Sequence, residues 1–380
     1  MKTIHDIRAV IYDPAHMNEY TERFMNIPGC EYLAVTGEDK RSEMIDYCRK
    51  KYRSKEVIIL KSFKGRLFQM CPGSPGMICC NYRLVNTGFN CLYNCAYCYL
   101  QLYLNAYGIV LFTNMEDVYR EIAVFLEDRR EDPDMIYRIG TGEFTDSLMI
   151  DDVAGVGCRL VSLCSEYPNV MIELKTKSNQ IDHLLSVPKK GNAVIGWSVN
   201  TPYNVAKYEE GSASLEERLA AARKAAESGY AVAFHFDPII IHDGWKEAYG
   251  SVIDRIFGVL PDDAIAWISL GTYRYVPQFK DVVRNNFPEE KMSAGEFFAC
   301  EDGKHRYVWN LRAAIYCFIK ERIRSHSAKP YIYMCMESRR MWKYVYGIDF
   351  ADSDQFERHF SAHMKEWLAS RASDDGSNIS

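Results

Sequence analysis

The chain has 380 residues, 48% of them hydrophobic, with a formal net charge of −5 and 13 cysteines. This length suits a large enzyme domain with additional units, and the mild acidity argues against a general nucleic-acid binder, although local patches decide phosphate contact. The sequence has neither an apolar run long enough to span a membrane nor a secretion-signal core, and its many cysteines suit a reducing compartment, so we expect a cytoplasmic protein with no membrane partner.

Residues 1–76 predict a small N-terminal α/β domain. Ile7–Tyr12 has the pattern of a strand, Arg41–Tyr52 that of a charged helix, and Glu56–Leu60 that of a buried strand. The turn-rich run from Cys71 to Gly76 predicts a linker to the next domain.

Residues 77–275 alternate short apolar runs with helical patterns. The expected strands are Tyr82–Val85, Met135–Ile139, Val170–Leu174, Ala193–Val199, Ala231–Phe236 and Ala266–Leu270. The expected helices are Glu116–Arg129, Val153–Tyr167, Leu215–Ser228 and Lys246–Leu260. Ser214 and Glu217 have the spacing of a capping box at the start of one helix, and Gly229 ends that helix. Six β-α repeats predict a parallel sheet and a partial TIM-type barrel.

Residues 276–370 change pattern to a hairpin followed by helices. Asp302 and Gly303 form a strong turn signal between two aromatic-rich runs, Glu296–Cys300 and His305–Trp309. Lys304, His305, Arg306 and Tyr307 cluster at the expected tip. Such a cluster is either the solvated end of a hairpin, which the residues alone favour, or a basic aromatic probe for nucleic acid. We expect residues 371–380 to form a disordered tail.

Three cysteines within eight residues, Cys91, Cys95 and Cys98, carry the strongest chemical signal. The C-x3-C-x2-C spacing lets three thiolates hold three irons of a [4Fe-4S] cube and leaves the fourth iron open. A structural zinc site usually has four protein ligands, and Cys79 or Cys80 can supply a fourth thiolate here. Zinc and chance clustering therefore remain alternatives.

Polar residues follow several of the expected strands. The second strand leads into the segment from Gly140 to Asp146, and the later ones end in further polar side chains: Lys175, Ser198, Asn200, His235, Asp237 and Arg274. Active sites of β/α barrels lie at the carboxyl ends of the strands. The sequence therefore predicts a site there, beside the cysteine loop.

Residues 70 to 310 contain a set of short motifs in addition to the cysteine triplet: Cys71-Pro, Cys80-Asn-Tyr82, Asn86-Thr-Gly-Phe-Asn90, Tyr99-Leu-Gln101, Phe144-Thr-Asp146, Trp197-Ser-Val-Asn200, His235-Phe-Asp-Pro-Ile239, Gly244-Trp245, Ser269-Leu-Gly-Thr-Tyr-Arg274 and Gly303-Lys-His-Arg-Tyr307. With these motifs the stretch resembles the spore photoproduct lyase family of radical S-adenosylmethionine (SAM) enzymes. The resemblance implies a partial (β/α)6 barrel of the radical SAM type.

The resemblance also implies two cofactors and the residues that hold them. Cys91, Cys95 and Cys98 would bind the [4Fe-4S] cluster, and SAM would chelate its open iron. The positions expected to contact SAM are Thr145, Asp146, Lys175, Ser198 and Asn200, and Glu143 is a further candidate that does not match the family. A lysine can pair with the SAM carboxylate, and a carboxylate can meet its amino or sulfonium charge.

The family reaction repairs a methylene-bridged thymine dimer in ultraviolet-damaged DNA. One electron, from a flavodoxin- or ferredoxin-type donor, cleaves SAM to methionine and a 5′-deoxyadenosyl radical. That radical abstracts hydrogen from the dimer, the bridge breaks, and a hydrogen donor quenches the product radical. The resemblance implies that the hairpin enters the duplex and helps to flip the dimer out.

The chain departs from the family at the donor. Family members carry a cysteine just before the Ser/Thr-Asp step, whereas Glu143 stands there and no cysteine occurs between Cys98 and Cys158. Gly-Thr-Gly-Glu143 instead resembles a SAM-binding segment of other radical SAM enzymes. Tyr97 and Tyr99 match family tyrosines that relay hydrogen, and packing around the cluster is their alternative role.

Cys335 is a candidate replacement donor if the C-terminal region folds over the barrel mouth; a buried, inert thiol is the other interpretation. Two functions compete with thymine-dimer repair. One is a related radical SAM enzyme acting on another nucleobase or a small molecule. The other is a non-catalytic iron–sulfur or zinc protein that senses redox state or binds a partner.

Overall fold

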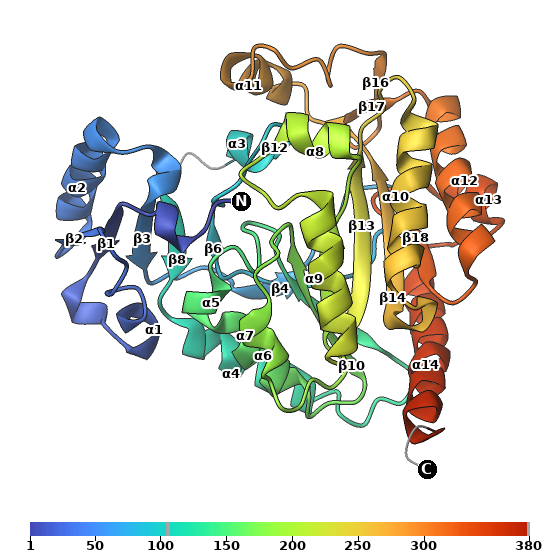
Figure 1. Ribbon diagram of the computed structural model, residues 1–380, viewed down its shortest axis with the longest axis horizontal. Helices are drawn as coiled ribbons and strands as arrows, with labels where there is room; N and C mark the ends of the chain where they lie inside the picture. The colour runs from blue at the N-terminus through green and yellow to red at the C-terminus, as the bar shows by residue number, and fades with distance from the viewer. Residues whose placement is uncertain (104–106, 378–380) are drawn as a thin grey trace.

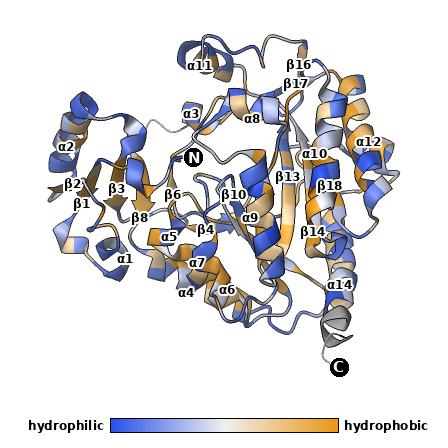
Figure 2. Ribbon diagram, viewed as in Figure 1, coloured by the Kyte–Doolittle hydropathy of each residue, from blue (hydrophilic) through white to orange (hydrophobic). Residues whose placement is uncertain are grey.

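The computed structural model describes residues 1–103 and 107–377, with side chains through Arg371. Two sheets dominate, as Figure 1 shows: a small one in the N-terminal part (blue) and a larger, curled one that forms the body of the molecule. Among the described residues, no helix is both long and apolar enough to cross a membrane. Strands are the most continuously hydrophobic elements in Figure 2, while the helices alternate polar and apolar faces.

The large sheet has eight strands in the order β18-β14-β13-β11-β10-β9-β5-β4. All neighbouring pairs are parallel except the one between β4 and β5. Its strands are β4 (Phe68–Met70), β5 (Arg83–Val85), β9 (Tyr137–Thr141), β10 (Val170–Thr176), β11 (Val194–Ser198), β13 (Ala231–Ile239), β14 (Ile265–Thr272) and β18 (Tyr331–Met334). The expected six parallel strands are therefore confirmed in order, and the partial barrel with them.

Helices connect the strands and pack against them. They are α4 (Met115–Glu127), α5 (Asp151–Ala154), α6 (Val156–Cys164), α7 (Asp182–Leu185), α8 (Pro202–Tyr208), α9 (Leu215–Glu227) and α10 (Trp245–Val259). The capping box of Ser214 and Glu217 is present at the start of α9. The helix expected over Val153–Tyr167 is instead broken at Gly155, whose φ is +67°. A side chain there would collide with the guanidinium of Arg23, which donates to the carbonyl of Ala154.

The small sheet has the order β2-β1-β3-β8-β6 and is wider than the sequence indicated. Its strands are β1 (Ala9–Tyr12), β2 (Glu31–Ala34), β3 (Val57–Lys61), β6 (Gly88–Phe89) and β8 (Ile109–Phe112), with α1 (Glu19–Glu22) and α2 (Glu38–Lys51) between the first three. We expected this unit to end at residue 76, but β6 and β8 come from beyond that point. The cysteine loop lies between those two strands, so the small sheet holds both of its ends.

The C-terminal region contains the expected hairpin, an extra barrel strand and a long helix. Strands β16 (Phe297–Ala299) and β17 (His305–Tyr307) pair antiparallel, and β15 (Arg274–Tyr275) joins β17. The helices are α11 (Phe279–Asn286), α12 (Trp309–His326), α13 (Arg339–Tyr346) and α14 (Ser353–Ser377).

Two expectations for this region differ from the structure. Residues 331–334 form β18 where only helices were expected, because the short apolar run Tyr-Ile-Tyr-Met is buried against β14. Helix α14 continues through residues 371–377, which we expected to be a disordered tail, and residues 378–380 lie outside the described part.

Candidate active site

The cysteine loop carries Cys91, Cys95 and Cys98 between β6 and α3 (Leu100–Tyr103). The backbone N–H of Tyr93 points at Cys91 Sγ, with 3.4 Å between the two heavy atoms. Burial raises the pKa of all three thiols. They are therefore protonated when free, and a metal that binds them must displace protons.

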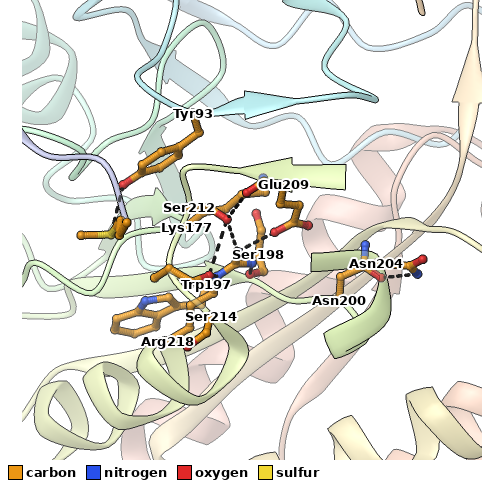
Figure 3. A network of polar contacts seen from close by, with 12 residues as sticks. Tyr93, Lys177, Trp197, Ser198, Asn200, Asn204, Glu209, Ser212, Ser214 and Arg218 are labelled. Carbon is orange, nitrogen blue, oxygen red and sulfur yellow. Dashed lines mark hydrogen bonds and ion pairs between the residues drawn. The ribbon is translucent and has the colours of Figure 1, made fainter. Parts of the chain in front are cut away.

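A buried ion pair fixes this loop to the barrel. The short strand β7 (Asn94–Cys95) pairs antiparallel with β12 (Glu209–Glu210). Arg218 of α9 donates to the carboxylate of Glu209 at 2.5 Å and to the carbonyl of Ser198 at 2.8 Å, as Figure 3 shows. The hydroxyl of Tyr97 donates to the second oxygen of Glu209. Tyr97 therefore has a structural partner in the described residues, in addition to its place beside the cysteines.

The surroundings of the loop fit an anionic iron–sulfur cluster. The positive charges of Lys55 and Lys177 oppose the effect of burial on the pKa of the cysteines. Backbone N–H groups and lysines are the partners that thiolate-bound clusters require. Among the described residues, no group of three His, Cys, Asp or Glu side chains is arranged to hold one metal ion. Three thiols beside lysines and a backbone N–H fit a [4Fe-4S] cluster, whose cube places each thiolate on a different iron.

A lysine on β10 and an ion pair that includes an acid on β13 face the barrel mouth, with β11 between these two strands. Lys175 lies near the carboxyl end of β10, and none of the described side chains pairs with its amine. Arg274 binds Asp237 of β13 through two hydrogen bonds of 3.0 and 3.1 Å. Burial alone would raise the pKa of Asp237, but Arg274 and Lys175 lower it, so this carboxylate stays charged. Of these groups, Lys175 is the cation left to bind a ligand.

One layer below the mouth, a buried hydrogen-bonded chain crosses the barrel. Glu173 accepts hydrogen bonds from the hydroxyl of Tyr82 and lies 2.5 Å from Nε2 of His235, whose Nδ1 is 2.6 Å from Ser269 Oγ. Glu173 precedes Lys175 by two positions and His235 precedes Asp237 by two, so each pair shares a face of its strand. The chain of bonds makes a rigid floor for the mouth. Sequence reasoning missed Glu173, although a lone acid in an apolar strand is a signal of such a role.

The segment after β9 places Glu143 beside the cysteine loop. The hydroxyl of Tyr99 is 2.9 Å from Glu143 Oε1 and 2.8 Å from its carbonyl oxygen. Gly142 has a φ of +96°, and a Cβ there would come within 2.8 Å of the Lys175 carbonyl. The segment can therefore pack against β10 only with glycine at that position.

The remaining predicted SAM contacts differ in how open they are. Asp146 is committed within the protein, since it accepts bonds from Thr176 Oγ1 at 2.6 Å and from the Lys177 N–H at 2.7 Å. Asn200 is also committed, to Asn204, Tyr249 and the carbonyl of Pro238. Thr145 and Ser198 are both buried, the first beside Met149. The structure thus presents Glu143 and Lys175 as the open groups, and Asp146 and Asn200 as supports.

The hairpin does not present the basic tip that its sequence suggested. Arg306 is 1% exposed and binds Asp302 through two hydrogen bonds of 2.5 and 2.7 Å. Tyr307 is 3% exposed and stacks on Phe297. Lys304 donates to Ser74 Oγ, and His305 is partly covered by Tyr275. The exposed aromatic side chain of this hairpin is Phe298, at 58%.

Two thiols lie near the mouth. Cys335 follows β18 directly, so the C-terminal region does reach the barrel edge, and its Sγ is 4.0 Å from Arg274. Cys71 is close enough to Glu143 and Cys335 for their charges to act on it, and burial raises its pKa to about 12. Burial likewise raises the pKa of Cys335. Both groups therefore keep their S–H at neutral pH.

A cysteine triplet on a loop beside the mouth of a partial parallel barrel defines the radical SAM class of protein. The family model for spore photoproduct lyase matches residues 78–336, more than half of the sequence. The chain belongs to the spore photoproduct lyase family.

Individual relatives agree with this assignment. The spore photoproduct lyase of Bacillus subtilis is 26% identical over 242 residues, covering 63% of this chain and 68% of that protein. The one of Clostridium acetobutylicum is 24% identical over 268 residues, covering 68% and 76%. A solved mutant spore photoproduct lyase with bound AdoMet and a dinucleoside spore photoproduct is 20% identical, with a TM-score of 0.71 over 87% of this chain and 99% of that one. This last likeness concerns the fold.

Proposed function

We propose that this chain is a radical SAM enzyme that repairs spore photoproduct in DNA, acting as a carbon–carbon lyase. Family membership supports the reaction, and the relatives named above carry that activity in their names. The observation that carries the proposal is the position of the cysteine loop. It is fixed by the Glu209–Arg218 pair beside a mouth where none of the described carboxylates pairs with Lys175.

The cofactors of this reaction are a [4Fe-4S] cluster and SAM. Cys91, Cys95 and Cys98 hold the cluster, and together the two cofactors supply a 5′-deoxyadenosyl radical when bound. Lys175 binds the carboxylate of SAM, because its amine has no carboxylate partner among the described residues. Glu143 accepts a hydrogen bond from the SAM amino group and stays oriented by Tyr99. Asp146 and Asn200 do not contact SAM directly in this proposal; their hydrogen bonds hold the neighbouring segments in place.

The hydrogen atom that ends the reaction comes from a thiol at the mouth. Glu143 stands where the family has its donor cysteine, and a carboxylate cannot readily give up a hydrogen atom. Cys71 lies near Glu143, Cys335 lies beside Arg274, and both thiols keep their S–H. Transfer of that hydrogen to the product carbon leaves a sulfur radical, and the O–H of Tyr99 is positioned by Glu143 as the next group that can return hydrogen to it.

The test is an anaerobic turnover assay with reconstituted protein, SAM, dithionite and the dinucleotide spore photoproduct. We expect 5′-deoxyadenosine and repaired thymines by mass spectrometry. The variants Cys71→Ala and Cys335→Ala should separate the donor from the bystander, because only loss of the donor leaves SAM cleavage intact while repair falls. Cys317→Ala, in α12, is the control.

If 5′-deoxyadenosine forms but the dimer stays intact, the enzyme cleaves SAM and acts on a substrate other than this DNA lesion. If the protein binds metal but forms no 5′-deoxyadenosine, the result would favour a non-catalytic iron–sulfur sensor over an enzyme. If the double variant Cys71→Ala/Cys335→Ala repairs the dimer as well as the unmodified protein, neither thiol is the hydrogen donor.

A further inference from the structure

A basic segment lies next to the cysteine loop. Residues 49–55 read Arg-Lys-Lys-Tyr-Arg-Ser-Lys, so five of seven positions are cationic in a chain with a net charge of −5. The segment covers the last turn of α2 and the connection to β3. A run of cations is usually a solvated surface, so its position has to be argued from contacts.

Direct contacts fix this basic segment against the cysteine loop and the chain that leaves it. The amine of Lys55 donates to the carbonyl of Tyr93, between Cys91 and Cys95. The hydroxyl of Tyr107 donates to the carbonyl of Tyr52 at 2.7 Å, and the N–H of Gly108 donates to Ser54 Oγ at 3.0 Å. In Figure 1, α2 lies on the outer side of the small sheet and α3 lies between that sheet and the barrel.

The cations of the segment are only partly neutralised. Arg49 pairs with Asp46 at 3.0 Å and Lys51 with Glu31 at 3.0 Å. Lys50 and Arg53 are exposed, and none of the described carboxylates forms an ion pair with their side chains. An excess of positive charge therefore faces solvent beside the cysteine loop.

We propose that the basic segment, residues 49–55, is the docking surface for a small acidic one-electron carrier protein that reduces the cluster. This inference rests on the proposed function, because only a redox-active cluster needs such a carrier. The carrier gives one electron to the cluster and leaves oxidised by one electron. Electron transfer slows steeply with distance, so a carrier must dock close to the cluster, and Lys55 joins the segment to that loop.

The chemistry of such a partner matches the surface. Opposite charges steer weak, short-lived complexes and raise the rate of encounter without a large apolar interface, which suits a carrier that must leave after each electron. DNA is also an acidic partner. However, the dimer must reach the mouth at the carboxyl ends of the barrel strands, whereas the basic segment belongs to the small sheet.

The test uses the variant Lys50→Glu/Arg53→Glu and a bacterial flavodoxin as the probe. Binding is measured by calorimetry at low salt, and reduction of the reconstituted cluster by flavodoxin hydroquinone is followed by stopped-flow absorbance. We expect the variant to bind flavodoxin about tenfold more weakly and to be reduced more slowly by a similar factor, with the difference fading at high salt. With dithionite, which needs no docking surface, both proteins should form 5′-deoxyadenosine at the same rate.

The control is Lys224→Glu/Arg358→Glu, which reverses one exposed lysine and one exposed arginine on α9 and α14 and gives the same net charge. Equal flavodoxin binding and equal cluster reduction in all three proteins would overturn the proposal. So would a variant that loses affinity for DNA and retains it for flavodoxin, because the segment would then be a nucleic-acid surface. Absence of 5′-deoxyadenosine with dithionite in the unmodified protein would instead count against the proposed function, and the binding measurement would still decide the docking surface.

Discussion

The barrel mouth and the hairpin were both predicted as functional regions, but their charged side chains differ in whether the protein itself supplies a partner. At the mouth, the segment after β9, the end of β10 and the cysteine loop come together, and none of the described carboxylates pairs with Lys175. In the hairpin, Arg306 and Lys304 are already bound by Asp302 and Ser74. The mouth therefore has a charged side chain available to bind a ligand, whereas the basic side chains of the hairpin bind other residues of the protein.

The difference shows what makes a charged residue available. Residue type was suitable in both places, but the partners were decided by segments remote in sequence. The loop containing Ser74 is 230 positions away from Lys304. A cluster of basic residues therefore indicates a binding surface only after its internal carboxylates have been accounted for.

The largest effect is expected at the cysteine loop. Cys95→Ala should abolish cluster assembly and 5′-deoxyadenosine formation, because two thiolates cannot replace three on the cube. Iron and sulfide content and the visible absorption of the reconstituted protein measure the first effect. Cys164→Ala, a buried thiol on α6, is the control and should retain both. A Cys95→Ala protein with full iron content would refute the assignment of the triplet.

At the mouth, Lys175→Ala should weaken SAM binding by roughly 10- to 100-fold, since a charged hydrogen bond contributes about 1.5–3 kcal/mol. Equilibrium dialysis with the reconstituted protein measures the dissociation constant. The matched control is Lys61→Ala, which replaces the lysine at the end of β3 in the small sheet. Unchanged SAM affinity in the Lys175 variant would mean that the mouth lysine serves a different group.

Sequence periodicity was sufficient to locate the barrel. Alternation of short apolar runs with amphipathic helices identified all six central strands within a few residues. The spacing of the triplet predicts the ligands of the cluster, and that assignment stays a prediction. Local pattern could not show that β8, which follows the cysteine loop, returns to the small sheet. Strand pairing across tens of residues depends on tertiary packing, and a four-residue apolar run such as β18 has no periodicity that identifies it.

The site was predicted less evenly. Lys175 and Glu143 were predicted as SAM contacts because they lie at or just after strand ends in a recognisable pattern, and their contact with SAM stays a prediction. Glu209 and Arg218 were missed, since nothing local indicates that an acid after one helix and a base inside the next form a pair. The same limit applies to Asp146 and Asn200, whose side chains are bound by neighbouring segments.

In the hairpin, Arg306→Met should affect stability rather than DNA affinity. Removing one partner of a buried ion pair costs about 3–5 kcal/mol of unfolding free energy. We expect the lower end of that range here, because Asp302 keeps a longer ion pair with Lys304 at 3.7 Å. The double variant Asp302→Asn/Arg306→Met should regain most of that loss. Urea denaturation measures both values, and DNA affinity is measured by fluorescence anisotropy. A stable Arg306→Met protein with poor DNA binding would restore the basic tip as a probe.

The pH dependence of the same pair has a definite sign. Burial acts to raise the pKa of Asp302, but hydrogen bonds from Arg306 outweigh it and lower the pKa to about 2. An unfolded aspartate has a pKa of about 3.9. The contribution of the pair is therefore fully present above pH 4 and is lost as pH falls from about 4 towards 2. As pH falls through that window, the unmodified protein should lose stability relative to the double variant, which has no titratable side chain at position 302.

The smallest effect is expected for Lys304→Ala. Its amine donates to Ser74 Oγ and lies 3.7 Å from a carboxylate oxygen of Asp302, so it has little charge to offer to a phosphate. We expect DNA affinity to change by less than about threefold, the range of a weak surface contact. Phe298→Ser provides the comparison on the exposed strand of the hairpin, since an exposed aromatic can stack on a base. If Lys304→Ala weakens DNA binding tenfold while Phe298→Ser does not, the hairpin must release Lys304 from Ser74 when DNA binds.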